Sequence, residues 1–91
     1  MVSFKSADTE GLSKGVRVRH FVNIERVALR KLRQLHVAEI LSDLKVPPGN
    51  RLEPLKCQRK GQYSIRINDQ FRVCFNWTIA GATNVAIVDY P

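Results

Sequence analysis

The chain changes from a helical to a strand-like spacing of apolar residues near residue 50. Within residues 23–36 the apolar side chains recur every three or four positions, as on one face of a helix. They are Ile24, Val27, Ala28, Leu32 and Leu35. The opposite face carries Arg26, Arg30, Lys31 and Arg33. We therefore predict the main helix over residues 23–36, with Asn23 as its N-cap.

Two shorter helical segments flank this main helix. Asp8 or Thr9 is a suitable cap for a short helix that runs through Leu12 and ends near Gly15. Residues 37–44 repeat apolar side chains at helical spacing, but out of phase with the main helix. This phase shift predicts a bend or a second short helix, and the prolines that follow, within residues 46–50, end helical structure.

The second half of the chain alternates apolar and polar residues with the period of a β-strand. The predicted strands are residues 51–56, 63–68, 71–78 and 85–90, and residues 2–6 show the same alternation. The first of these is expected at a sheet edge, because Pro54 has no N–H group to donate. Helices followed by an antiparallel sheet indicate an α+β fold with the helices on one face.

The hairpin between the second and third of these strands has a register that the sequence fixes. A three-residue loop, Asn68-Asp69-Gln70, places Ile67 opposite Phe71 and keeps the apolar side chains of both strands on one face. A two-residue loop would mix apolar and charged side chains on the same face. The favoured register places Arg66 directly opposite Arg72 on the other face.

Opposed arginines destabilise a sheet unless an anion lies between them, because their Cβ atoms are roughly 5 Å apart. The planar guanidinium group of Arg66 and of Arg72 suits a phosphate, which it binds through two oxygens. The alternative is that both side chains extend into solvent. Lys56, Arg59 and Lys60 precede the hairpin and add to a basic sheet face.

Composition narrows the class of protein. The 91 residues suit a single domain spanning residues 1–91, and 44% hydrophobic residues argue against disorder. Fifteen Lys and Arg against eight Asp and Glu give a charge of +7, which attracts polyanions such as nucleic acid. No apolar run reaches membrane-spanning length and no signal peptide is recognisable, so we expect a cytoplasmic protein. The two cysteines have neither disulfide-scaffold nor zinc-site spacing, and no phosphate-binding glycine loop, HExxH or GxSxG motif is present.

Several segments match the pattern of a known family. They are Arg51-Leu52-Glu53-Pro54-Leu55-Lys56, Arg59-Lys60-Gly61-Gln62-Tyr63-Ser64-Ile65, Asn68-Asp69-Gln70-Phe71-Arg72-Val73-Cys74-Phe75 and Val88-Asp89-Tyr90. Ser3-Phe4-Lys5 and the turn at residues 46–49 fit as well. The chain thereby resembles the HigB toxins of the RelE superfamily over nearly its whole length.

The resemblance implies a bacterial type II toxin that cleaves mRNA during translation on the ribosome. It implies a HigA-like helix-turn-helix antitoxin as partner, operator DNA bound only through the toxin–antitoxin complex, and an endoribonuclease without a metal or other cofactor. The implied fold is two or three N-terminal helices packed on a curved, mainly antiparallel sheet of four to five strands. The alternative is a catalytically silent module of the same fold that binds RNA, the ribosome or the antitoxin.

The same resemblance assigns four catalytic residues. In this chemistry the RNA 2′-OH attacks the adjacent phosphorus, so the enzyme moves protons and stabilises a crowded, negatively charged phosphorane. Arg72 matches the family arginine that would stabilise the phosphorane, and Lys56 matches a lysine that would hold phosphate or assist proton transfer. Asp89 and Tyr90 match a terminal Asp-Tyr pair, of which the tyrosine would exchange a proton.

Four further residues are expected to bind RNA. Arg59 and Lys60 lie in the basic loop, Arg66 follows from the hairpin register alone, and Phe71 lies beside the hairpin turn. Stacking of bases on aromatic side chains is a common mode of RNA binding. For the other aromatic residues of the strands, packing against the helices is the preferred interpretation.

Two positions depart from the family pattern. Glu53 stands where many relatives have histidine, and Pro91 follows Asp89-Tyr90 where relatives end in histidine. Histidine is the natural acid or base near neutral pH. His20 and His36 lie in the helical half, where we interpret them as structural or exposed side chains. Whether this chain cleaves RNA is therefore a separate question from its family.

Overall fold

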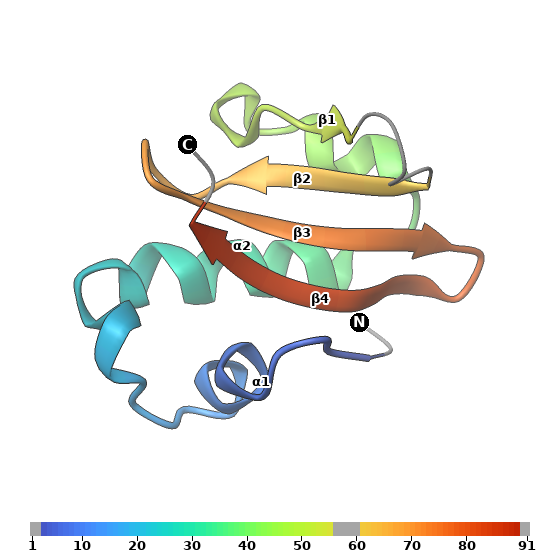
Figure 1. Ribbon diagram of the computed structural model, residues 1–91. Helices are drawn as coiled ribbons and strands as arrows, with labels where there is room; N and C mark the ends of the chain where they lie inside the picture. The colour runs from blue at the N-terminus through green and yellow to red at the C-terminus, as the bar shows by residue number, and fades with distance from the viewer. Residues whose placement is uncertain (1–2, 56–60, 90–91) are drawn as a thin grey trace.

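The computed structural model describes residues 3–55 and 61–89 and has the expected α+β architecture (Figure 1). The described elements are α1 (Ala7–Ser13), the 3₁₀ helix η1 (Arg19–Ile24), α2 (Glu25–Val37), the 3₁₀ helices η2 (Leu41–Lys45) and η3 (Pro48–Asn50), β1 (Glu53–Pro54), β2 (Gln62–Arg66), β3 (Phe71–Thr78) and β4 (Gly81–Asp89). The four strands form an antiparallel sheet in the order β1-β2-β3-β4. Two α-helices are therefore present in these ranges, and no helix there is long and apolar enough to cross a membrane.

The hydrophobic core lies between one face of the sheet and the helices. Figure 1 shows α2 running across this face, with α1 beside β4. The core side chains of the strands include Ile65, Val73, Phe75 and Val85, each fully buried. Those of the helices are Leu12, Phe21, Ile24, Ala28, Leu32 and Leu35. The alternation of side chains along β2 and β3 leaves every second residue of these two strands on the opposite face.

The predicted hairpin register is confirmed. Ile65 pairs with Val73, and Arg66 pairs with Arg72, so both arginines lie on the face opposite the helices. The backbone N–H of Ile67 donates to the carbonyl of Phe71 at 3.0 Å and closes the three-residue loop.

Both helix starts differ from the prediction. Ser6, rather than Asp8 or Thr9, caps α1, because its hydroxyl accepts the backbone N–H of Thr9 at 3.3 Å. Thr9 is instead buried, and its hydroxyl accepts the N–H of Ile87 at 2.9 Å. Asn23 lies inside the 3₁₀ helix that leads directly into α2, and no side chain caps that helix.

Lys31 also differs from the prediction, because it is buried rather than on the exposed face of α2. Only 8% of this lysine is exposed, and its Nζ donates to Asn50 Oδ1 at 2.5 Å. The amide of Asn50 donates in turn to Gln34 Oε1 at 3.0 Å and to the Leu44 carbonyl at 3.1 Å. This network joins α2 to the two 3₁₀ helices after the predicted bend.

The sheet edges differ in length from the expected strands. β1 is an edge strand, as Pro54 indicated, but it has only two paired residues. β4 begins at Gly81 rather than Val85, because the pairing of Trp77 with Ala82 extends the ladder toward the turn. Of the expected strand at residues 2–6, the described part contributes a single parallel bridge between Phe4 and Val85.

Candidate functional site

A largely buried arginine dominates the sheet face opposite the helices. Across this face Glu53 pairs with Ser64, Ser64 with Cys74, and Cys74 with Ala86. Ser64, Cys74 and Ala86 are small and buried, with at most 7% of each exposed. These small side chains leave room for the long side chain of Arg72, which lies two residues before Cys74 on the same face of β3.

The guanidinium group of Arg72 is held by three groups of the chain. Its Nε donates to Ser64 Oγ at 2.8 Å, and its Nη2 donates to the main-chain carbonyl of Arg51 at 2.8 Å. Glu53 lies further away, with its carboxylate 4.0 Å from Nη2. The side chain of Arg72 is 12% exposed, so it is largely fixed before any ligand arrives.

Arg66 turns away from Arg72 and pairs with Asp69 in its own hairpin loop. The two opposed arginines therefore neither extend freely into solvent nor require a bound anion to be held apart. Each binds an acceptor of the chain on its own side. This arrangement offsets the like-charge repulsion that the register imposes.

Phe71 and Asp89 lie on the other face of the sheet, although Phe71 is next to Arg72 in sequence. They are cross-strand partners, so their side chains share a face. Phe71 packs edge-on against Phe21, with ring centroids 5.9 Å apart, and Asp89 accepts a hydrogen bond from Gln70 Nε2 at 3.0 Å. The described residues thus bring Arg66 and Arg72 together but do not place Asp89 beside them.

A cavity of 520 Å³ lies on the helix side of the sheet, at the end that carries Phe71 and Asp89. Its lining consists of His20, Asn23, Ile24, Asn68, Gln70, Phe71, Ile87 and Asp89. His20 lies 3.1 Å from the carboxylate of Asp8, so the structure gives it a partner. Phe71 is thus part of this cavity as well as of the core contact with Phe21.

Four of the expected site residues, Lys56, Arg59, Lys60 and Tyr90, lie outside the described residues, as does Pro91. The sequence interpretation did not identify Ser64 or the carbonyl of Arg51 as partners of Arg72. Strand alternation could have identified Ser64, because it shares a face with Arg66 and Arg72. The sequence pattern gives no comparable indication that the main-chain carbonyl of Arg51 accepts a bond from Arg72.

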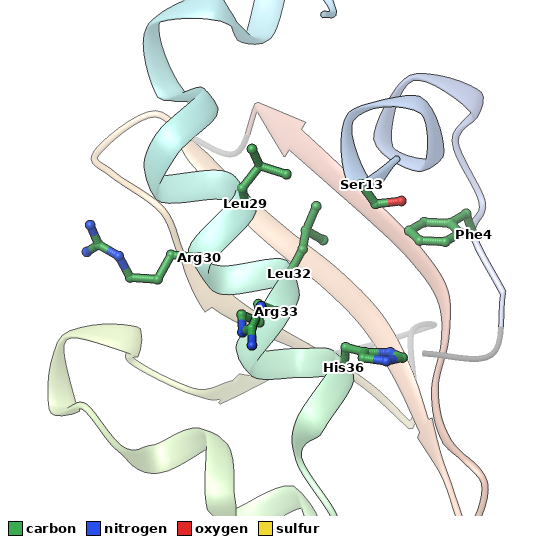
Figure 2. Close-up of a pocket in the computed structure, with 7 residues that line it drawn as sticks. All are labelled: Phe4, Ser13, Leu29, Arg30, Leu32, Arg33 and His36. Atoms are coloured by element: carbon green, nitrogen blue, oxygen red, sulfur yellow. The ribbon is translucent and has the colours of Figure 1, made fainter. Parts of the chain in front are cut away.

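A second cavity, a groove of 680 Å³, lies between α2 and the N-terminal segment (Figure 2). Leu29 and Leu32 face the side on which Phe4 and Ser13 lie, and His36 points toward Phe4. Arg30 and Arg33 also line the groove, and none of its lining residues in the described part of the chain is acidic. The groove combines an apolar floor with basic side chains.

Within residues 3–55 and 61–89, no three His, Cys, Asp or Glu side chains lie close enough together to hold a metal ion. The polar groups of these ranges that lie near the sheet site are the arginines of the sheet face and the amide, carboxylate and imidazole groups around the cavity of 520 Å³.

Together, the fold and this face define a small basic α+β domain with an arginine fixed on its sheet. Residues 15–90 match the profile of the HigB-like toxins, described as RelE-like toxins of type II toxin–antitoxin systems. Because the match covers most of the chain, the protein belongs to this family.

Individual relatives agree with the family assignment. The chain is 47% identical over 62 residues to "Toxin HigB-1" of Vibrio cholerae serotype O1, a match that covers 68% of this chain and 65% of that protein. It is 38% identical over 55 residues to an uncharacterized protein of Haemophilus influenzae, covering 60% of this chain and 54% of that protein. The matches thus span less than two thirds of either relative's length.

Proposed function

We propose that this protein is the toxin of a type II toxin–antitoxin pair and cleaves mRNA on the ribosome. The observation that carries the proposal is the fixed, largely buried Arg72 beside Arg66, on one sheet face of a HigB-like toxin. The bacterial cytoplasm is the compartment in which such a toxin meets translating ribosomes. A catalytically silent module of the same fold is the second candidate.

The proposed reaction uses the RNA's own nucleophile. The 2′-OH loses its proton and its oxygen attacks the adjacent phosphorus, while the bond to the 5′ oxygen breaks and that oxygen gains a proton. The products are a 2′,3′-cyclic phosphate and a 5′-OH. No metal ion is needed when basic side chains stabilise the phosphorane and other groups move the two protons.

Arg72 is proposed to stabilise the phosphorane, because its Nη1 atom and the second Nη2 hydrogen have no hydrogen-bond acceptor among the described residues. Arg66, with Arg59 and Lys60 of the preceding loop, is proposed to bind the RNA backbone. Lys56 and Tyr90 remain the proposed proton-transfer groups on the strength of the family resemblance. Asp89, proposed as a catalytic residue, and Phe71, proposed to bind RNA, lie on the sheet face opposite Arg72. An RNA that contacts all three residues would have to pass around the end of the sheet.

We expect the ribosome to be required. One small basic domain binds phosphates but offers few groups that align the 2′-OH with the leaving oxygen. Positioning supplies much of the rate in such a reaction. An mRNA held by the ribosome arrives already extended and aligned.

The proposal is tested by incubating the purified protein with one mRNA, with and without ribosomes, and mapping the product ends. Ribosome-dependent cleavage with 5′-OH ends supports it, and Arg72→Ala should lower that cleavage to a small residual rate. Arg26→Ala is the matched control, because it removes the same charge from an exposed position on α2. Binding to ribosomes without any cleavage would instead identify the silent module.

The partner we propose is a HigA-like antitoxin, through which the pair also binds operator DNA. The groove between α2 and the N-terminal segment suits an acidic amphipathic segment of that antitoxin. Its apolar floor, which includes Leu29 and Leu32, would bury leucine-like side chains, and Arg30 and Arg33 would pair with carboxylates.

This partner site is tested by measuring antitoxin affinity for Arg33→Glu against Arg17→Glu, which makes the same charge change outside the groove. Arg33→Glu should weaken binding by roughly tenfold or more, because like charges across an interface are strongly unfavourable. Equal affinities of the two variants would place the antitoxin elsewhere on the protein.

A further inference from the structure

We propose that Ser64 and the main-chain carbonyl of Arg51 position Arg72, holding its guanidinium group ready for a phosphate before RNA binds. The proposal rests on the proposed function, because it explains how that arginine is made competent. Ser64 and Arg51 do not touch the substrate in this account. They act through Arg72.

The burial of Ser64 and its single hydrogen-bond partner support this role. Ser64 is fully buried in the middle of β2, where strands favour β-branched and aromatic residues and where its neighbours Tyr63 and Ile65 pack in the core. A buried hydroxyl is costly without a partner. The partner is Nε of Arg72, at 2.8 Å, a donor on the same sheet face.

Arg51 contributes its backbone rather than its side chain. Its φ of 47° and ψ of 57° place it in the left-handed region, which a non-glycine residue rarely adopts. Its N–H donates to the Pro48 carbonyl at 3.1 Å, and its own carbonyl accepts from Nη2 of Arg72 at 2.8 Å. Unfavourable backbone conformations concentrate at functional sites, and here the conformation directs a carbonyl at the arginine.

The two contacts leave one edge of the guanidinium group open. Of its five N–H donors, the Nε donor and one Nη2 donor are used by Ser64 and Arg51. One Nη1 donor and the second Nη2 donor point along a common edge, which can bind two phosphate oxygens at once. A group fixed in advance gives more transition-state stabilisation than one that must be ordered during the reaction.

The main test compares Ser64→Ala with Thr9→Ala in ribosome-dependent cleavage. Both variants remove a buried hydroxyl that accepts one hydrogen bond, but Thr9 contacts Ile87 on the helix side of the sheet. We expect Ser64→Ala to lower kcat roughly tenfold at nearly constant KM, as expected for one lost hydrogen bond in the transition state. Thr9→Ala should keep the parent kcat, and Ser64→Thr, which restores the hydroxyl, should recover part of the loss.

A second experiment tests whether Ser64 acts through Arg72. Adding Ser64→Ala to Arg72→Ala should have no further effect on the residual rate, because the group that Ser64 positions is already absent. A parent-like kcat for Ser64→Ala, or additive losses in the double variant, would overturn the proposal.

A third arm is independent of nuclease activity. In the ¹⁵N-labelled free protein, the Arg72 Nε–H resonance, assigned by its absence in Arg72→Ala, should be sharp and protected from exchange with water. In Ser64→Ala it should broaden or exchange quickly, whereas in Thr9→Ala it should not change. An unchanged resonance in Ser64→Ala would overturn the positioning role, and a parent protein that cleaves no RNA would overturn only the proposed function.

Discussion

At the scale of single residues, the main feature is an arginine buried among small side chains with its own set of acceptors. Arg72 opposes another cation across the hairpin, yet Ser64, the Arg51 carbonyl and Glu53 surround it. Glu53 is the weakest of these, at 4.0 Å and with 60% of its side chain exposed. It therefore affects the charge of this sheet face more than it affects the fold.

We predict that Glu53→Gln strengthens binding of a short single-stranded RNA by up to roughly fivefold, because an exposed ion pair is worth about 0–1 kcal/mol. The unfolding free energy should change by less than about 0.5 kcal/mol. Fluorescence-anisotropy titrations measure the affinity, with Glu39→Gln as a control that makes the same charge change at an exposed position. Weaker RNA binding in Glu53→Gln would show that the carboxylate orients Arg72 rather than opposing the RNA.

Alternation and hairpin geometry were enough to predict that Arg66 faces Arg72. They could not predict which acceptors each arginine takes, because the Arg51 carbonyl depends on one backbone turn. The position of Asp89 could not be predicted from the sequence either. A register shift between Cys74 and Asn76 changes which residues of β4 pair with β3, and the sequence pattern does not predict this shift.

At the scale of elements, the link between α2 and the segment that follows it depends on a buried polar network. Asn50 accepts from Lys31 and donates to Gln34 and to the carbonyl of Leu44. The pattern of charges on α2 predicted an exposed Lys31. The chain beyond the bend folds back over this lysine, which helical periodicity cannot reveal because it describes one element at a time.

Asn50→Ala should lower the unfolding free energy by about 3 kcal/mol, because it leaves the Lys31 ammonium group buried without an acceptor. Urea denaturation followed by circular dichroism measures the change. Asn23→Ala is the control, because Asn23 is exposed. A loss below about 0.5 kcal/mol, the usual range of surface substitutions, would contradict the importance of this network.

The same network predicts a pH dependence of stability. Burial, with a smaller contribution from the nearby Arg30, lowers the pKa of Lys31 from its ordinary value of 10.5. The folded protein therefore binds fewer protons than the unfolded chain between the lowered pKa and 10.5, so stability rises with pH across that window. Lys31→Met should remove this rise. Denaturation midpoints of both proteins at several pH values up to about 10.5 measure it, and parallel profiles would contradict it.

At the scale of the whole molecule, the sheet separates two basic surfaces. Arg66 and Arg72 lie on one side, whereas the groove with Arg30 and Arg33 belongs to the helix side. The net charge of +7 favours binding of polyanions to the molecule as a whole. Among the described residues, the guanidinium groups that hydrogen-bond to the chain are those of Arg66 and Arg72, on the first side. Charge alone could therefore predict a polyanion partner but not the side on which it binds.

Salt dependence distinguishes the two sides. For a single-stranded RNA, each phosphate contact contributes about −0.7 to the slope of log affinity against log salt. Arg66→Ala should make the slope shallower by about that amount, whereas Arg26→Ala, on α2, should leave it unchanged. Equal slopes for both variants and the parent would mean that the RNA does not lie on the arginine face.

The contacts of β4 with the N-terminal segment have a consequence for synthesis of the protein. The N–H of Lys5 donates to the Val85 carbonyl, the N–H of Val85 donates to the Ser3 carbonyl, and Thr9 binds Ile87. These contacts join residues separated by about 80 positions, so the sheet cannot close on its N-terminal segment while residue 87 is still inside the ribosome. The N-terminal segment and β4 can therefore pack together only after residue 87 has left the ribosome, which makes this closure a late step in the synthesis of residues 1–91.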